Sequence, residues 1–168
     1  TGACAFLKAL LHKYLSLQGK SVADDEEPAD INKAPSVAEV EDSFLKYYDD
    51  NVKADRTETR AYQIRGTNIP REYVRLTQGI VPAEALKSLS KAESATVTEY
   101  LVALLIWSVY DTQLSGRGDE LPVKVSVPVN LRRFLPSKTL RNFSSYINVG
   151  MRFSEGDYTF EDVLAAVR

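Results

Sequence analysis

Residues 127–150, VPVNLRRFLPSKTLRNFSSYINVG, place four basic side chains between two apolar stretches. The first stretch begins upstream as VKVSV, in which the valines alternate with Lys124 and Ser126. The second stretch, SYINVGMRF at 145–153, shows the same alternation, with Ile147, Val149, Met151 and Phe153 on one face. Alternation of this kind is typical of a strand with one buried face. The sequence therefore predicts two strands joined by a basic connection, in which a proline stands at each end of NLRRFL.

Upstream of these strands, residues 97–113 have the pattern of a long helix. Its residues are apolar nearly all the way round, so the helix must pack on more than one side. Thr96 and Glu99 form a T-x-x-E capping box at its start, and Pro82 suits the first residue of a helix that runs to about Lys91. The mixed order of helices and strands predicts an α/β or α+β fold with a mixed sheet and a long buried helix.

The first 81 residues predict shorter elements. TGACAFLKALLHKYL has helical spacing of its apolar residues, and Gly19 is placed to cap that helix. A short helix is expected over Ala38–Tyr48, and strands are expected for TRAYQIRG, ending at Gly66, and for residues 73–81. The acidic, proline-containing residues 20–36 predict a flexible loop.

Composition limits the classes of function. The 168 residues suffice for one compact domain, and 21 basic against 23 acidic residues give a net charge of -2, which argues against a nucleic-acid partner. The single cysteine, Cys4, fits a reducing compartment. No apolar run reaches the length of a membrane span, no signal-peptide pattern is present, and no cluster of metal ligands is found. We expect a cytoplasmic protein without a membrane span or a bound metal.

Both ends of the sequence interrupt a helical pattern. The chain begins at Thr1 directly in the first helix, and Thr159 with Asp162 begins a helix that has made about two turns when the sequence stops at Arg168. We therefore expect a fragment of a longer protein, truncated at both ends. Such a fragment would expose strand edges and apolar surface, and we expect it to dimerise or aggregate.

Two residues near the predicted strands are candidates for a site. Arg132 follows the first strand and could bind a carboxylate with both arms of its guanidinium, although the basic connection could equally be an ordinary solvated loop. Asn148 lies within a strand, where asparagine is disfavoured. It could make a structural hydrogen bond or donate to developing oxyanion charge in a cleft. The one histidine, His12, has no carboxylate one helical turn away and is expected to be a partly exposed helix residue.

Four stretches together resemble the chloramphenicol acetyltransferase-like superfamily, which includes alcohol acetyltransferases, plant BAHD enzymes and condensation domains. The first is TGACAFLKALLHKYLSLQG, and the second consists of AYQIRGTNIP, VRLTQGIVPAEALKSLSK and ATVTEYLVALLIWSVY. The third is VPVNLRRFLP, and the fourth is SYINVGMRF. The resemblance is greatest to bacterial alcohol acetyltransferase-like proteins. It implies that residues 1–168 are the central and C-terminal-lobe portion of one such domain, with Thr1 directly after the family's H-H-x-x-x-D-G motif.

The resemblance also implies roles for individual residues. Arg132 would pair with the aspartate of the upstream motif, and Asn148 would stand near the acyl-transfer centre. Arg133, Lys138 and Arg141 are candidates to bind the phosphates of acyl-coenzyme A, or else are solubilising loop charges. The catalytic base would be the second histidine of the upstream motif, so the fragment alone would not catalyse transfer.

The intact protein would pass an acyl group, with acetyl as one candidate, from acyl-coenzyme A to a small-molecule alcohol or amine. Acyl-coenzyme A would be a co-substrate, with no permanently bound cofactor. Two alternatives stay open. The domain could have lost catalysis and serve as a docking module for a carrier protein, or the resemblance could be accidental and the chain an independently folding, monomeric module.

Overall fold

The computed structural model of the chain describes residues 2–20, 34–51, 57–154 and 156–168. Its elements are mixed helix and strand, which confirms the expected α+β class. The chain divides into two compact units. Unit 1 comprises Thr1–Asp55 and Pro128–Tyr146, and unit 2 comprises Arg56–Val127 and Ile147–Arg168.

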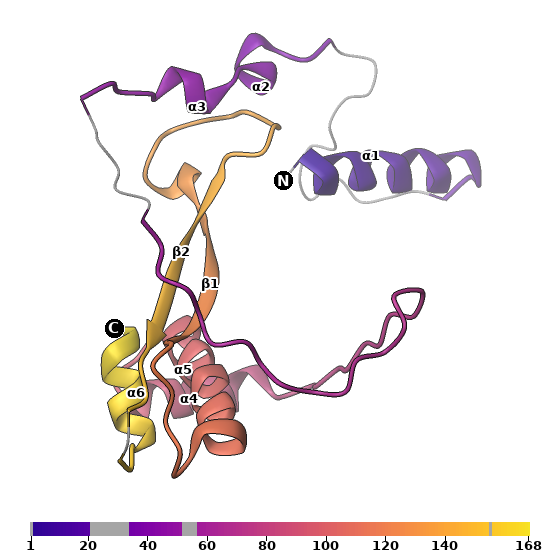
Figure 1. The fold of residues 1–168 in the computed structure, drawn as a ribbon. Helices are drawn as coiled ribbons and strands as arrows, with labels where there is room; N and C mark the ends of the chain where they lie inside the picture. The colour runs from indigo at the N-terminus through magenta and orange to yellow at the C-terminus, as the bar shows by residue number, and fades with distance from the viewer. Residues whose placement is uncertain (1, 21–33, 52–56, 155) are drawn as a thin grey trace. The chain divides into compact units, whose positions relative to one another are not determined.

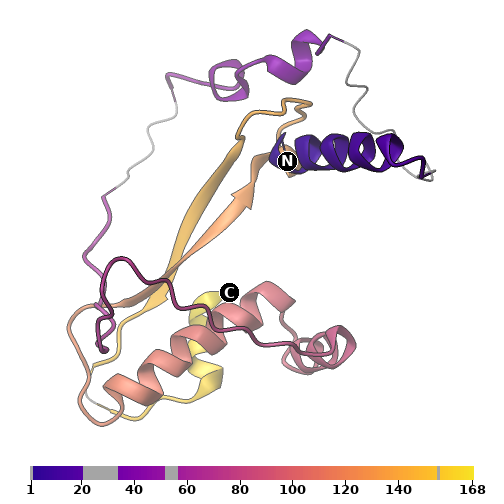
Figure 2. The same cartoon turned by 90° about the vertical axis from the view of Figure 1, so that its right-hand side faces the viewer.

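Unit 2 contains the larger core, built on the helix predicted to be buried. Helix α5 (Val97–Val109) packs against α6 (Phe160–Val167), and α4 (Ala83–Ala92) contacts α5 as well. Both Figure 1 and Figure 2 show α6, in yellow, lying beside α5. The side chains buried at the centre of this core come from α5, α6 and the segments that flank the strands: Ala103, Ile106, Val109, Leu114, Phe153, Val163 and Leu164.

The predicted starts of α5 and α6 are confirmed. The Thr96 backbone N–H donates to the Glu99 carboxylate at 2.7 Å, and the Glu99 N–H donates to the Thr96 hydroxyl at 3.2 Å. Thr159 and Asp162 form the same reciprocal pair at the start of α6. These pairs satisfy backbone donors that a helix leaves without partners in its first turn. The α-helix itself ends at Val109, before the predicted end near Gln113, and a π-helical turn, η1 (Tyr110–Leu114), continues it to Leu114.

The two predicted strands form an antiparallel two-stranded sheet, β1 (Val123–Asn130) with β2 (Ser144–Met151). Ser126 lies across from Asn148, and Lys124 lies across from Gly150. The alternation of the sequence holds for most of the sheet, since Val125, Val149 and Met151 pack partly buried against the core. Ile147 departs from it and is 54% exposed.

The packing of unit 1 depends on Phe143 and on the loop that precedes it. Phe143 is buried and packs edge-on to Phe44, with ring centroids 5.1 Å apart. Thr139, also buried, donates its hydroxyl to the Glu41 carbonyl at 2.7 Å. Unit 1 also contains α1 (Gly2–Leu17) and the short 3₁₀ turn η2 (Leu131–Arg133). Gly19 ends α1 with φ of 70°, as predicted.

The single helix expected over Ala38–Tyr48 was wrong, because the structure has two one-turn helices there. They are α2 (Val37–Val40) and α3 (Ser43–Lys46). The Asp42 side chain accepts from the backbone N–H groups of Phe44 and Leu45, so it starts a new helix instead of continuing the first. The Glu41 carbonyl bonds to Thr139, which removes it from a continuous helical ladder.

The strands expected before α4 were also wrong. Residues 57–81 form neither helix nor strand and pair with no described strand. The Tyr62 N–H donates to the Pro122 carbonyl at 2.9 Å, and the Gln113 side chain takes the place of a neighbouring strand at Arg65. Gln113 accepts from the Arg65 N–H at 2.8 Å and donates to the Arg65 carbonyl at 3.0 Å. One side chain can satisfy the backbone N–H and carbonyl of one residue, but it has no further backbone groups with which to pair the residues that follow.

Most of the loop predicted over 20–36 lies outside the described residues. In the described part of the chain, no single helix is long and apolar enough to cross a membrane. Helix α4 and the continuous helix of α5 with η1 reach that length and apolar character only when taken together, and the two are bent by 83° relative to each other.

Candidate functional site

Asn148 lies in β2 with a half-buried side chain. Its Oδ1 accepts a hydrogen bond from the Ser126 hydroxyl on β1 at 2.5 Å. The Asn148 side chain also helps to lower the pKa of the Glu58 carboxyl. Of the two roles considered for an asparagine in this strand, the structural hydrogen bond is therefore present.

Glu58 in turn forms an ion pair with Lys124. The Lys124 Nζ lies 2.7 Å from the Glu58 carboxylate and also donates to the Thr59 carbonyl at 3.2 Å. The hydrogen bond from Lys124 is the largest cause of the lowered pKa of Glu58, followed by the influence of the Asn148 side chain. We refer to Glu58, Lys124, Ser126 and Asn148 as the Asn148 cluster. All four belong to unit 2.

The chemistry available to this cluster follows from the donors of an amide. A side-chain amide has one oxygen acceptor and two N–H donors. In Asn148 the oxygen accepts from the Ser126 hydroxyl, which leaves the N–H side of the amide for another acceptor. A fixed N–H of this kind is the type of group that stabilises developing negative charge on a substrate oxygen.

Arg132 lies in η2 and binds the loop that follows it. Its Nη2 donates to the Thr139 carbonyl at 2.7 Å and to the Arg141 carbonyl at 2.6 Å. Its Nη1 lies 3.5 Å from the Phe143 carbonyl. Both Nη2 hydrogens are thus used within unit 1. A bidentate bond to the expected upstream aspartate through Nη2 would need one of these carbonyls to give way.

The other basic candidates lie on the surface of unit 1. Arg133 and Lys138 are exposed, and Arg141 is 61% exposed with its Nη1 4.0 Å from the Asp42 carboxylate. His12 is half-buried in α1, in accord with the sequence prediction. The structure therefore brings Arg132 and the three other basic residues into one unit and places Asn148 in the other.

The sequence analysis missed Glu58 and Lys124. Lys124 had a signal, because the alternation in VKVSV puts it on the same strand face as Ser126. Glu58 had none, since TETR contains neither a motif nor a periodicity that distinguishes this carboxylate from its neighbours. Its ion pair with Lys124 depends on the path of residues 57–66, which the strand prediction described wrongly.

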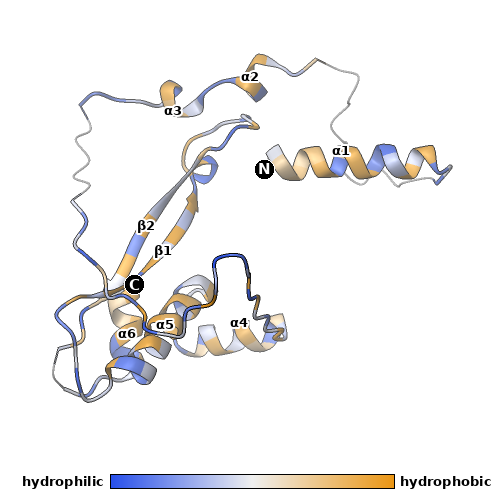
Figure 3. Cartoon of the chain, turned by 45° about the vertical axis from the view of Figure 1, so that its right-hand side comes forward, coloured by the Kyte–Doolittle hydropathy of each residue, from blue (hydrophilic) through white to orange (hydrophobic). Residues whose placement is uncertain are grey.

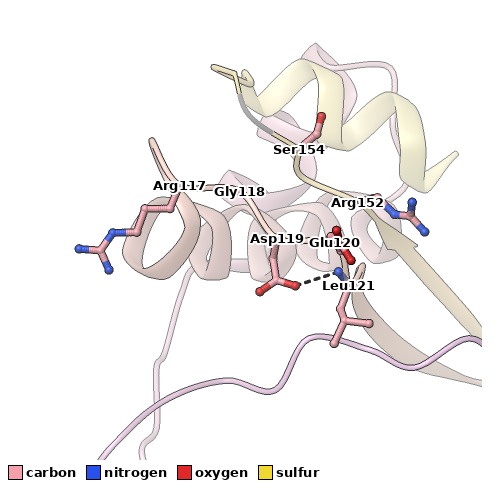
Figure 4. Close-up of a pocket in the computed structure, with 7 residues that line it drawn as sticks. All are labelled: Arg117, Gly118, Asp119, Glu120, Leu121, Arg152 and Ser154. Atoms are coloured by element: carbon pink, nitrogen blue, oxygen red, sulfur yellow. Dashed lines mark hydrogen bonds between the residues drawn. The ribbon is translucent and has the colours of Figure 1, made fainter.

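A separate open hollow lies where η1 leads into β1. It has a volume of about 880 Å³ and contains none of the predicted site residues. Figure 4 shows Arg117 pointing away from Arg152 across this hollow, and the Asp119 carboxylate accepting from the Leu121 N–H, at 2.8 Å. Acidic and basic side chains both line the hollow, so its lining does not favour a ligand of one sign of charge. Its residues are Arg117, Gly118, Asp119, Glu120, Leu121, Arg152 and Ser154.

Comparison with known families connects these observations. Residues 31–160 match the alcohol acetyltransferase family, and the matched range includes Arg132, Asn148 and the whole Asn148 cluster. No curated protein and no solved structure matches the chain. Because the family match covers well over half of the 168 residues, the chain belongs to the alcohol acetyltransferase family of acyltransferases, as the motifs around Arg132 and Asn148 predict.

Proposed function

We propose that this protein takes part in acyl transfer from acyl-coenzyme A to a small alcohol or amine. The observation that carries the proposal is the alcohol acetyltransferase match over residues 31–160. The Asn148 cluster supports it, because an amide whose oxygen is already bonded presents its N–H side in one orientation.

The proposed reaction is a single displacement at a thioester. The acceptor oxygen or nitrogen attacks the carbonyl carbon while a general base removes its proton. The new C–O or C–N bond forms, the carbonyl oxygen carries negative charge in the tetrahedral intermediate, and the C–S bond then breaks. The proton passes from the base to the departing sulfur, which leaves as a thiol. In this proposal the free N–H of Asn148 donates to the oxyanion, and the base is the second histidine of the upstream motif that the resemblance implies.

Unit 1 offers residues that fit the phosphates of coenzyme A. Arg133 and Lys138 are exposed cations, and Arg141 is only loosely paired with Asp42. Guanidinium and ammonium groups form strong hydrogen bonds with phosphate oxygens. We propose these three residues as phosphate ligands and Arg132 as the residue that holds their connecting loop.

The test measures free thiol released from acetyl-coenzyme A in the presence of a panel of small alcohols and amines, with the full-length protein. We expect Asn148→Ala to lower kcat by about 100- to 1000-fold, the range for loss of one oxyanion donor. Asn142→Ala is the control, because Asn142 is exposed and its side-chain oxygen accepts a hydrogen bond from the hydroxyl of the nearby Ser144. Thiol release that is equal in both variants would contradict the role of Asn148.

A folded full-length protein that releases no thiol would contradict transfer from coenzyme A. Carrier-bound donors would then be tested in the same assay. Binding to a carrier protein without transfer would support the docking module, the alternative function of another class.

A further inference from the structure

We propose that Thr139 is a positioning residue for coenzyme A, because its buried hydroxyl fixes the backbone from which Lys138 and Arg141 reach the phosphates. This inference rests on the proposed function, in which these two cations bind phosphate oxygens. It assigns a role in substrate binding to a residue that carries no charge and whose side chain is itself buried.

The first support is the burial of Thr139 in a loop whose cations are exposed. Thr139 stands between Lys138 and Arg141 in the sequence and is 2% exposed, whereas both cations are exposed. Threonine is mostly exposed in proteins, since its hydroxyl needs a partner once water is removed. The buried hydroxyl of Thr139 must therefore be bonded inside the protein.

The second support is a chain of hydrogen bonds that passes through this hydroxyl. It donates to the Glu41 carbonyl at 2.7 Å and accepts from the Arg141 N–H at 3.2 Å. The Thr139 N–H donates to the Ser137 hydroxyl at 3.1 Å. Ser137 is bonded in turn to the hydroxyl of Ser43, a buried residue of α3, at 2.6 Å. The backbone of the loop is thus connected to α3 up to the N–H of Arg141.

The third support is that the other backbone groups of residues 139–141 are also held. Arg132 binds the two carbonyls on either side of Leu140. The Leu140 N–H donates to the Glu39 carbonyl at 2.8 Å. The Leu140 carbonyl faces the start of α1, since a Cβ on Gly2 would lie 2.2 Å from its oxygen. Every backbone N–H and carbonyl of residues 139–141 therefore bonds or contacts another part of unit 1.

This arrangement favours phosphate binding over a solubilising role for the cations. Connecting loops are usually more mobile than the elements that they join, and cations that only increase solubility need no fixed backbone. Here the backbone is fixed while the side chains of Lys138 and Arg141 stay exposed. Cations on a preorganised loop bind an anion without the entropic cost of ordering that loop.

The experiment measures coenzyme A binding to the full-length protein by calorimetry, and KM for acetyl-coenzyme A from thiol release. Thr139→Val removes the hydroxyl and keeps the shape of the side chain, whereas Thr139→Ser keeps the hydroxyl. We expect Thr139→Val to weaken binding and raise KM by about 3- to 10-fold with kcat nearly unchanged, because losing one hydrogen bond lowers the fraction of protein with the loop in its binding conformation. Thr139→Ser should recover most of this loss. Thr98→Val, the same substitution at an exposed position of α5, is the matched control.

A second variant keeps the test decisive if Thr139→Val is unstable. Ser137→Ala removes the acceptor of the Thr139 N–H and should weaken coenzyme A binding in the same direction. Loss of folded protein would lower the apparent kcat and leave KM unchanged, so a raised KM identifies positioning. Thermal unfolding of each variant measures any loss of stability separately. Wild-type affinity for coenzyme A in both Thr139→Val and Ser137→Ala would overturn the inference.

Pyrophosphate is a probe that does not depend on acyl transfer. It should bind to the full-length protein, and Thr139→Val should weaken its binding as it weakens that of coenzyme A. If this weakening is seen but the wild type releases no thiol, the proposed transfer fails and the positioning role of Thr139 stands. If thiol is released with the same KM in the wild type and in Thr139→Val, the positioning role fails and the transfer stands. A wild type that binds neither coenzyme A nor pyrophosphate would also overturn the inference.

Discussion

At the scale of single residues, Gly150 is the position in β2 where a side chain would collide with backbone. A Cβ placed there would lie 2.2 Å from the Val123 carbonyl oxygen and 2.9 Å from the Lys124 Cα. Neither group can move as the end of a side chain can, so the strands must separate. The sequence gives no sign of this, since glycine in a strand equally marks a bulge or a bend.

We expect Gly150→Ala to lower the free energy of unfolding by about 1–3 kcal/mol, the usual cost of overpacking. Urea unfolding of the 168-residue chain measures it. Gly79→Ala is the control, because a Cβ there meets nothing within 4 Å. Equal unfolding midpoints for the two variants would show that β1 and β2 tolerate the methyl group.

Glu58 gives a prediction about pH. Its pKa is lowered from 4.5, chiefly by the hydrogen bond from Lys124. A lowered pKa in the folded state stabilises the fold above the ordinary pKa, and this contribution is lost as the pH falls through the lowered folded value. We expect Lys124→Met to raise the pKa of Glu58 back towards 4.5, as measured by an NMR titration of its side-chain carboxyl.

Glu99 is the internal control for that titration. Its pKa is also lowered, but by the backbone and hydroxyl of Thr96, and Lys124 is not among the causes. Its titration should be the same in Lys124→Met. A Glu58 titration that does not change would mean that Lys124 has little influence on this carboxylate.

At the scale of elements, the Gln113 side chain in η1 holds residues 57–66 where a neighbouring strand was expected. It bonds the N–H and the carbonyl of Arg65, and its Oε1 also accepts from the Tyr62 hydroxyl at 3.0 Å. We expect Gln113→Ala to speed hydrogen exchange at the Arg65 amide. Gln113→Glu keeps an acceptor for that N–H and should retain most of its protection. Equal exchange in all three proteins would show that other contacts hold the segment.

The loop after η2 is the second element whose order depends on one side chain. Arg132→Ala removes the donors to the Thr139 and Arg141 carbonyls, so we expect a loss of about 2 kcal/mol in stability and faster amide exchange across 139–143. In the full-length protein, acceptor preference should change less than stability does. Arg133→Ala is the exposed neighbour used as control. An unchanged Tm together with unchanged activity would contradict a holding role for Arg132.

At the scale of the whole molecule, the described residues expose many large apolar side chains. Figure 3 shows apolar residues along α1, and Phe6, Leu10 and Leu17 there are each more than half exposed. In residues 57–81, Val74 and Ile80 are almost fully exposed. Apolar surface on this scale favours association with other protein surfaces.

We therefore expect the 168-residue chain to self-associate as its concentration rises, which sedimentation velocity can measure. Replacing Phe6 and Leu10 with serine should weaken the association if α1 takes part, whereas Thr98→Ser on α5 should not. A monomer at all concentrations would instead support the independently folding module.

The sequence by itself determined the elements that depend on neighbours along the chain. Capping by Thr96 and Thr159 involves residues three positions apart, and the strand alternation has a period of two residues. The apolar character of α5 is a property of its own residues. Each of these elements could therefore be predicted from nearby sequence. The motif order also predicted the family. Three features were decided only by tertiary structure: the break between α2 and α3, the lack of strand pairing at 57–81 with any described residue, and the ion pair of Glu58 with Lys124. Each depends on a partner far away in the sequence, such as Thr139 for Glu41 or Gln113 for Arg65, and local spacing carries no information about which distant group will satisfy a backbone or an amide.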